Sequence, residues 1–321
     1  MPAAPFTLPG FAEIPPLGFG CCPMGGHGWG RVNDVELREA VATALDLGVR
    51  LFDTSDVYGL GASETLLGEA LRGKRDQALI ATKFGVRYEK GRTFHDTSPT
   101  WITAAAEASL RRLGVDCIDL YQMHYWDGAT PFVQILEALE ALRHAGKIRA
   151  YGVTNFDPRM QVTGSVTSRL ASFSYHYSLV HREHEDLITS VQTQSGPFFM
   201  SWGSLGQGIL SGEYRSLDQL APTDRRRREV YDNFHGEKFA AIQSVLAQLR
   251  EIAMEAGIPR VSQLALRWIV DKFPRALPLV GIKRPAQIID AAGMLHFSLD
   301  PAVLARIELA TSQFKTPMPS Q

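Results

Sequence analysis

The segment GVRLFDTSDVYG, residues 48–59, carries the pattern on which the fold prediction depends. A glycine ends an expected helix, a short apolar run follows, and the polar side chains of Asp53 and Tyr58 come after that run. Short apolar runs bounded by turn residues are typical of buried strands. The segment therefore predicts a strand that ends at a carboxylate, with a phenol close behind it.

Two later segments repeat this arrangement. Lys83 stands just beyond the apolar run 78–81, and His124 follows the run 117–123. In a barrel of parallel strands, the carboxyl ends of different strands meet at one mouth. We therefore predict that these two side chains share one pocket with the carboxylate and the phenol.

The four groups suit proton transfer to a carbonyl oxygen. An ammonium beside a phenol favours the phenolate, so Lys83 is expected to lower the pKa of Tyr58 from its usual value of about 10. Such a phenol is a good general acid. The combination predicts an enzyme.

Strand and helix signals alternate along the whole chain. Helix starts are marked by Asn33, Ser98 and Thr130, and stops by Gly48 and Gly114. Strands are expected at 18–20, 50–52, 78–81, 117–123, 148–154, 171–175, 197–201 and 277–280. Helices are expected to begin near 33, 63, 99, 130, 157, 184, 239, 261 and 285. Eight strand–helix pairs in this order predict a parallel (β/α)₈ barrel.

A doubly wound dinucleotide-binding fold is the main competitor. It requires G-x-G-x-x-G between the first strand and its helix. Residues 18–23 read GFGCCP, which breaks that spacing, and Pro23 removes an amide donor from the loop. We therefore set this fold aside.

Composition bounds the class of protein. A chain of 321 residues, 45% of them hydrophobic, can bury one large core, so a single domain over residues 1–321 is expected. The formal net charge of −1 provides no overall attraction to nucleic acid or to a membrane surface. No secretion signal or run of ~18 apolar residues is present, which predicts a cytoplasmic protein.

Cysteines and charge runs add little chemistry. Cys21, Cys22 and Cys117 form no disulfide framework, and no cluster has metal-ligand spacing, so reduced thiols and no metal site are expected. The four arginines at 225–228 have two open interpretations. They form either a solvated loop face or an anion contact above the pocket.

Several segments together resemble the aldo-keto reductase family, most closely its bacterial-type members. The similarity covers about residues 15–295. It rests on the segment 48–59 with Ser63-Glu64, on Ala81-Thr82-Lys83, on 108–124 and on Gly152-Val153-Thr154-Asn155-Phe156. The resemblance implies a barrel enzyme that binds NADP(H) across its mouth. By similarity, Tyr58 protonates the carbonyl oxygen, Lys83 lowers the pKa of Tyr58, Asp53 keeps Lys83 charged, and His124 orients the carbonyl.

The resemblance also implies a set of cofactor contacts. Thr154 and Asn155 match residues that bind the nicotinamide carboxamide, Ser174 stands where relatives have Gln, and Trp202 replaces a Tyr that stacks on the nicotinamide ring. Lys283 and Arg284 resemble a 2'-phosphate site that favours NADPH, and Ala291 replaces an Asn near the adenine. The remaining cofactor residues are Gly20, Cys21, Gly203, Leu205, Gly208, Gln287 and Asp290.

The substrate is expected to be a small molecule. Cys22, Trp29, Tyr125 and Trp126, together with Met24, are expected to line an aromatic and polar pocket. Such a pocket suits a sugar-like or a small aryl or alkyl aldehyde or ketone, interconverted with its alcohol. Reduction of a keto-sugar or enone in a natural-product pathway is an alternative. Cofactor sensing in the manner of the family's channel subunits is a second one, which the complete catalytic set disfavours.

Overall fold

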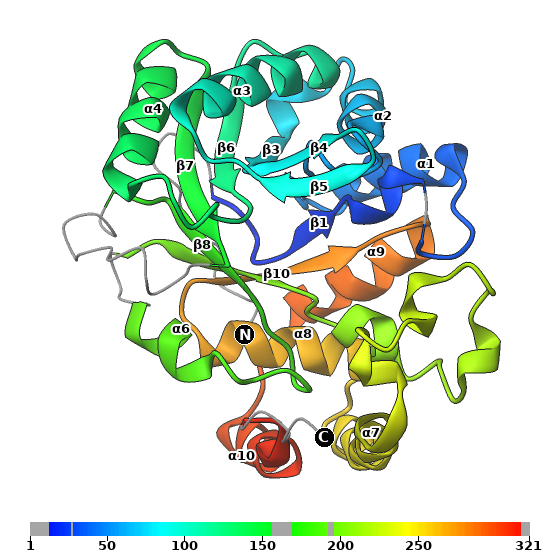
Figure 1. Cartoon of the computed structure of the whole chain (residues 1–321). Helices are drawn as coiled ribbons and strands as arrows, with labels where there is room; N and C mark the ends of the chain where they lie inside the picture. The colour runs from blue at the N-terminus through cyan, green and yellow to red at the C-terminus, as the bar shows by residue number, and fades with distance from the viewer. Residues whose placement is uncertain (1–12, 27, 156–168, 192–195, 316–321) are drawn as a thin grey trace.

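The structure, a computed structural model, describes residues 13–26, 28–155, 169–191 and 196–315. Eight parallel strands close into a barrel in the order β1-β10-β9-β8-β7-β6-β3-β2. Helices surround these strands on the outside (Figure 1). The strands are β1 (Gly18–Gly20), β2 (Leu51–Asp53), β3 (Leu79–Phe84), β6 (Ile118–Met123), β7 (Ile148–Thr154), β8 (Ser172–His176), β9 (Phe198–Trp202) and β10 (Ala276–Gly281). The predicted (β/α)₈ barrel is confirmed.

The helix ends follow the predicted signals. The Asn33 side chain accepts the backbone N–H groups of Val35 and Glu36, Ser98 accepts that of Trp101, and Gly114 ends its helix with a φ of 66°. The helices around the barrel are α1 (Asp34–Asp46), α2 (Ala62–Ala70), α3 (Pro99–Leu113), α4 (Phe132–His144), α6 (Glu185–Val191), α7 (Gly236–Glu255), α8 (Val261–Lys272) and α9 (Pro285–Ala292). The helix expected from Asp157 lies outside the described residues.

Two described elements were not anticipated. One is the antiparallel hairpin of β4 (Val86–Glu89) and β5 (Arg92–His95), whose turn residues Lys90 and Gly91 have positive φ angles of 51° and 79°. The other is α10 (Pro301–Ala310), which begins at an Asp300 cap. The sequence marks the hairpin by its turn residues Lys90-Gly91 and the helix by the cap residue Asp300. No helix in the described ranges is long and apolar enough to cross a membrane.

The barrel interior is filled by side chains. Buried apolar residues from the strands form an inner cluster that is closed by Ile14 before β1. A larger apolar cluster lies between the strands and the surrounding helices. The inner cluster contains Leu51, Leu79, Ala81, Leu120, Phe198, Met200, Leu277 and Leu279. Because the interior is packed, a ligand must bind at an end of the barrel.

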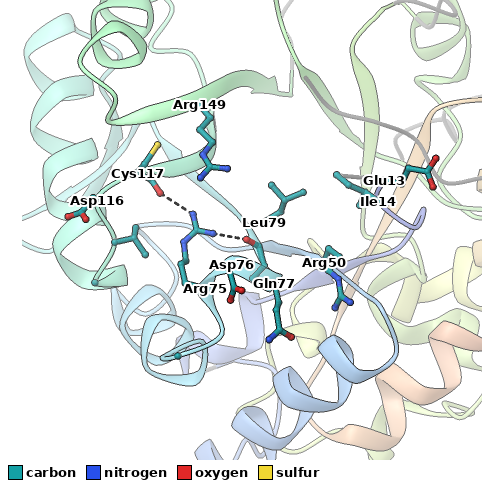
Figure 2. Close-up of a pocket in the computed structure, with 14 residues that line it drawn as sticks. Glu13, Ile14, Arg50, Arg75, Asp76, Gln77, Leu79, Asp116, Cys117 and Arg149 are labelled. Carbon is teal, nitrogen blue, oxygen red and sulfur yellow. Dashed lines mark hydrogen bonds between the residues drawn. The ribbon is translucent and has the colours of Figure 1, made fainter. Parts of the chain in front are cut away.

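A hollow of about 730 Å³ lies at the amino-terminal ends of β2, β3, β6 and β7 (Figure 2). Its arginines are tied to the protein. Arg75 donates to the carbonyl oxygens of Ala78 and Cys117 at 2.6 and 3.1 Å, and it pairs with buried Asp119 at 2.6 Å. Arg50 donates to the Leu45 carbonyl oxygen at 2.7 Å. These contacts hold the base of the barrel together.

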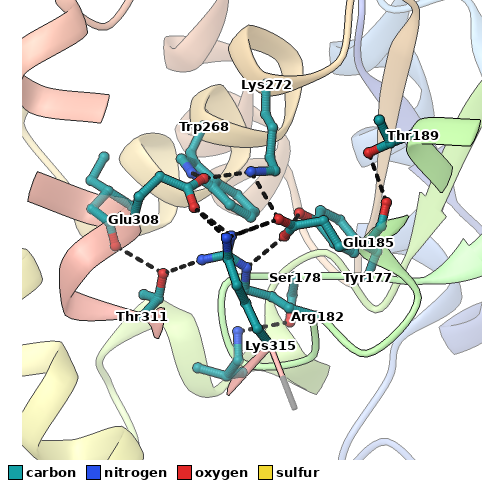
Figure 3. Close-up of polar contacts among 12 residues, drawn as sticks. Tyr177, Ser178, Arg182, Glu185, Thr189, Trp268, Lys272, Glu308, Thr311 and Lys315 are labelled. Atoms are coloured by element: carbon teal, nitrogen blue, oxygen red, sulfur yellow. Dashed lines mark hydrogen bonds and ion pairs between the residues drawn. The ribbon is translucent and has the colours of Figure 1, made fainter. Parts of the chain in front are cut away.

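A buried arginine joins α6, α8 and α10 (Figure 3). Arg182 donates to both carboxylate oxygens of Glu185, at 2.7 and 3.0 Å, and also to Glu308 and Thr311. Its guanidinium carbon lies 4.9 Å from the Trp268 ring centroid. Burial raises the pKa of Glu185, but the hydrogen bonds from Arg182 and Tyr177 outweigh burial and lower this pKa to about 2.

We predict that Arg182→Met lowers the free energy of unfolding by about 3 kcal/mol, because two carboxylates lose a buried cation. Urea denaturation measures the change. The control is Arg306→Met, which breaks an exposed 2.6 Å pair with Glu255 from the same α10 and should cost below about 1 kcal/mol. Equal losses in the two variants would contradict a special role for Arg182.

Candidate active site

A buried ion pair lies at the mouth of the barrel. The Nζ atom of Lys83, in β3, lies 2.8 and 2.7 Å from the two carboxylate oxygens of Asp53, the last residue of β2. Its third contact is the Thr54 carbonyl oxygen at 2.7 Å. Burial raises the pKa of Asp53, whereas the ammonium and the Gln122 amide oppose that rise. All three ammonium N–H groups are therefore used within this pair and its loop.

Tyr58 stands beside this pair in the loop after β2. The Lys83 Nζ atom lies 5.3 Å from its ring centroid, and His124 meets the ring edge-on with centroids 6.0 Å apart. The predicted fall in its pKa is wrong for this arrangement. Burial, with Cys22 and Asp53 nearby, raises the pKa of Tyr58 well above its ordinary value. Lys83 has no N–H left for the phenol, so Tyr58 stays protonated near neutral pH.

Close backbone packing holds the Tyr58 loop. Gly59 has a φ of 62°, and a Cβ atom there would lie 2.4 Å from the Gly25 carbonyl oxygen, so a larger residue would displace the loop after β1. Ser63 lies in the first turn of α2, so the helix start expected near residue 63 is confirmed. Its hydroxyl lies 2.8 Å from that of Thr54 and donates to the Cys21 carbonyl oxygen at 2.9 Å. The Ser63 motif thus joins the loops that carry the site.

A hydroxyl and a carboxyl group lie behind His124. Its Nδ1 atom is 3.3 Å from the Ser55 Oγ atom, which lies 3.0 Å from the Asp56 Oδ1 atom. Burial and the charges of Lys83 and His95 lower the pKa of His124 well below its ordinary value, so the ring is neutral. Burial and the Glu64 charge raise the pKa of Asp56 to about 7. The protonation state of Asp56 therefore influences, through Ser55, which ring nitrogen of His124 carries the proton.

The side chains of Asp53, Tyr58, Lys83 and His124 line a cavity of about 590 Å³ at the mouth of the barrel. It is smaller than the hollow at the base, but it alone of the two contains the predicted catalytic set. Predicted cofactor and substrate residues line it as well: Gly20, Cys22, Trp29, Tyr125, Thr154, Asn155, Ser174, Trp202, Gly203, Leu205, Gly208, Lys283, Arg284, Gln287 and Asp290.

Two strand hydroxyls face this cavity without a protein partner in the described structure. The Oγ1 atom of Thr154, in β7, and the Oγ atom of Ser174, in β8, are buried and make no hydrogen bond in the described structure. Asn155 lies beside them with a φ of 53° and donates to the His124 carbonyl oxygen at 3.3 Å. Buried polar atoms without partners indicate a polar ligand group here.

Trp202 is held firmly at the end of β9. Its Nε1 atom donates to the Asn155 side chain at 3.1 Å, and its ring stacks on His176 with centroids 4.3 Å apart. The His176 Nε2 atom lies 2.9 Å from the Gln207 amide nitrogen. Burial lowers the pKa of His176 to about 2. The neutral imidazole therefore supports a flat indole wall of the cavity.

The far end of the cavity carries cations. The Lys283 ammonium donates to the Trp29 carbonyl oxygen at 2.9 Å, and its backbone N–H donates to the Gln287 side chain at 2.8 Å. Asp290 accepts from Ser262 at 2.6 Å and pairs with Arg260 at 3.1 Å. Arg260, absent from the predicted set, is thus a further cation at this end.

Three predicted residues do not line the cavity. The Cys21 thiol is fully buried and points to the Phe19 carbonyl oxygen at 3.8 Å, because the backbone after β1 turns it into the core. Trp126 donates to the Thr130 carbonyl oxygen at 2.8 Å and packs against the core. Met24 is buried there too. Their placement corrects the prediction for these three side chains.

The long segment between β9 and α7 supplies lining residues that the sequence did not identify individually. Gln207, Tyr214, Arg226 and Tyr231 face the cavity, and so does Arg225. A connection of this length is typical of a functional loop, but length alone does not indicate which side chains turn inward. No group of three or more His, Cys, Asp or Glu side chains suited to a metal ion occurs in the described part of the chain.

Known proteins share this architecture and sequence. Aldo-keto reductase YhdN of Bacillus subtilis is 32% identical over 278 residues, which cover 86% of this chain and 83% of that protein. Aldo-keto reductase yakc [NADP(+)] of Schizosaccharomyces pombe is 32% identical over 314 residues, 92% of this chain and 88% of its own length. The structure of glycerol dehydrogenase AKR11B4 from Gluconobacter oxydans superimposes with a TM-score of 0.88 at 29% identity, covering 100% of this chain and 99% of that one.

The family model described as the Aldo/keto reductase family matches residues 16–311. That range includes all eight strands and every residue of the mouth described above. The chain is therefore a member of the aldo/keto reductase family of NAD(P)H-dependent oxidoreductases.

Proposed function

We propose that this protein interconverts an aldehyde or ketone and its alcohol with NADP(H), using Tyr58 as the proton donor. The observation that carries the proposal is the buried Lys83–Asp53 pair directly beside Tyr58 and His124 in one cavity. The NADP(+) in the name of the yeast relative supports the choice of cofactor.

The residues present fit a nicotinamide dinucleotide. The unpartnered hydroxyls of Thr154 and Ser174, with Asn155, suit a carboxamide, and the Trp202 indole suits a flat ring. Lys283 and Arg284 at the start of α9 suit a phosphate group. When bound, the cofactor supplies or accepts a hydride at the carbonyl carbon.

Residues of the protein protonate the substrate carbonyl oxygen and stabilise the charges that form during the reaction. A carbonyl that becomes an alcohol needs a proton, and protonated Tyr58 supplies it. The Lys83 ammonium, fixed by Asp53, places positive charge beside the phenolate that forms, and His124 orients the oxygen. The same atoms in reverse remove a proton from an alcohol.

The acid assignment predicts that Tyr58→Phe lowers kcat about 100-fold or more and leaves the affinity for NADPH unchanged within error. Loss of NADPH absorbance with 4-nitrobenzaldehyde measures the rate. The matched control is Tyr88→Phe, at a half-exposed tyrosine of the β4–β5 hairpin. A Tyr58→Phe enzyme that keeps most of its kcat would rule out Tyr58 as the acid.

The Asp56-Ser55-His124 contacts predict that reduction slows as pH rises through about 7. Protonated Asp56 lets Ser55 donate to the His124 Nδ1 atom, which leaves the proton on Nε2. Ionised Asp56 instead accepts from Ser55, so Nδ1 must donate and Nε2 loses its proton. Tyr58 and His124 do not titrate near pH 7, since their pKa values lie well above and well below it.

The Asp56→Asn variant tests this pH dependence, because its amide donates to Ser55 at every pH. Its kcat should stay level between pH 6 and 9, whereas the native enzyme and the exposed control Asp46→Asn decline. An Asp56→Asn profile that still falls near pH 7 would place the titrating group elsewhere.

The cations near α9 predict that NADPH binds about 10- to 100-fold more tightly than NADH, the range expected for one good charge-assisted contact. Quenching of Trp202 fluorescence reports both titrations. The double variant Lys283→Ala/Arg284→Ala should remove most of the difference, and the exposed control Arg72→Ala should keep it. Equal weakening of both cofactors would show that these cations do not meet the 2'-phosphate.

A further inference from the structure

A cationic and aromatic edge borders the catalytic end of the cavity. The guanidinium carbon of Arg225 lies 5.3 Å from the Trp29 ring centroid, and Trp29 meets Tyr231 edge-on with centroids 6.0 Å apart. The Trp29 Nε1 atom donates to the Cys22 sulfur at 3.2 Å. All four side chains line the cavity.

Electrostatic contacts connect this edge to the proton donor. Burial raises the pKa of Cys22, while the Trp29 hydrogen bond and the Arg225 charge lower it. Cys22 in turn contributes to the raised pKa of Tyr58. Arg226 instead influences Lys283 at the far end of the cavity. Arg225 therefore lies beside Trp29, between the Cys22–Tyr58 end of the cavity and Lys283, whose ammonium donates to the Trp29 carbonyl oxygen at 2.9 Å.

The charge of Arg225 is not neutralised by an acid. Its neighbour Arg226 pairs with Asp224 at 2.7 Å, and Arg227 donates to the Leu217 carbonyl oxygen at 2.7 Å. Within the described ranges, no Asp or Glu oxygen lies within 4.0 Å of the Arg225 guanidinium, and its buried Nε atom has no hydrogen-bond acceptor.

Backbone contacts hold this cation in place. The Arg225 backbone N–H donates to the Gly28 carbonyl oxygen at 2.9 Å. A Cβ atom on Gly28, whose φ is 80°, would lie 2.9 Å from the Arg225 Nε atom. The loop before Trp29 therefore leaves room for the guanidinium, which is half-buried and fixed at the edge.

We infer that Arg225 binds an anionic group on the substrate, a carboxylate or a phosphate, so that the preferred carbonyl compounds are negatively charged. This inference rests on the proposed carbonyl reduction. A guanidinium pairs with either anion through two parallel N–H groups, and the flanking Trp29 and Tyr231 rings reduce competition from water.

Matched substrate pairs test the inference. The carboxylate pair is 4-carboxybenzaldehyde with methyl 4-formylbenzoate, and the phosphate pair is D-glyceraldehyde 3-phosphate with D-glyceraldehyde. In at least one pair, the native enzyme should have a kcat/KM for the anionic member about 10-fold or more above that for the neutral one, and added salt should reduce the ratio. The pair with the larger ratio identifies the anion.

Variants of the arginine run locate the effect. Arg225→Gln should lower the anionic-to-neutral ratio of kcat/KM about 10- to 100-fold, mainly through KM, and Arg225→Lys should retain part of it because the charge remains without the planar fork. Arg228→Gln, at an exposed position of the same run, should keep the ratio of the native enzyme.

The outcomes separate this inference from the proposed function. No turnover of any aldehyde would contradict the proposed function itself. Turnover with no preference for the anionic members, or a preference that survives Arg225→Gln, would overturn the role of Arg225. So would an Arg225→Gln enzyme whose main defect is a raised Kd for NADPH, because Arg225 would then serve the cofactor phosphates.

Discussion

The Lys83–Asp53 ion pair is the interaction on which the rest of the site depends. Both side chains are almost fully buried, with 4% and 6% of their surfaces exposed. Removing two charges from water costs several kcal/mol per ion, so each is stable there only beside the other and with its hydrogen bonds satisfied. The pair joins adjacent strands β2 and β3 at their carboxyl ends. It thereby fixes a positive charge below Tyr58 and requires a packed barrel around it.

That arrangement explains why the Tyr58 phenol stays protonated. Lys83 donates all its N–H groups to Asp53 and Thr54, so its ammonium contacts Tyr58 only through the ring face and not through a hydrogen bond. Burial favours the neutral phenol. The proton is thus kept on Tyr58, and the nearby positive charge matters most once negative charge forms on the phenol oxygen. The Lys83–Asp53 pair therefore leaves the phenol without a hydrogen bond from Lys83 and keeps a positive charge near it.

The four consecutive arginines at 225–228 make different contacts although they are adjacent in the sequence. Arg226 pairs with Asp224, Arg227 donates to backbone carbonyls, Arg228 is exposed, and Arg225 lines the cavity beside Trp29. One run therefore contains a structural ion pair, a loop tie, a solvated charge and a candidate anion contact. Of the two interpretations left open by the sequence, the solvated loop face describes Arg228, and the anion contact is our proposal for Arg225.

The barrel and the four residues at its mouth could be predicted from the amino-acid sequence alone. Apolar strands, helix caps and terminal glycines are local signals, and polar residues after parallel strands must converge. The sequence did not determine that Cys21 and Trp126 turn away, that Arg225 turns in, or that Tyr58 keeps a high pKa. Those outcomes depend on loop paths, burial and the number of free N–H groups on Lys83. Each is set by contacts between residues far apart in the chain, so it could be seen only in the folded protein.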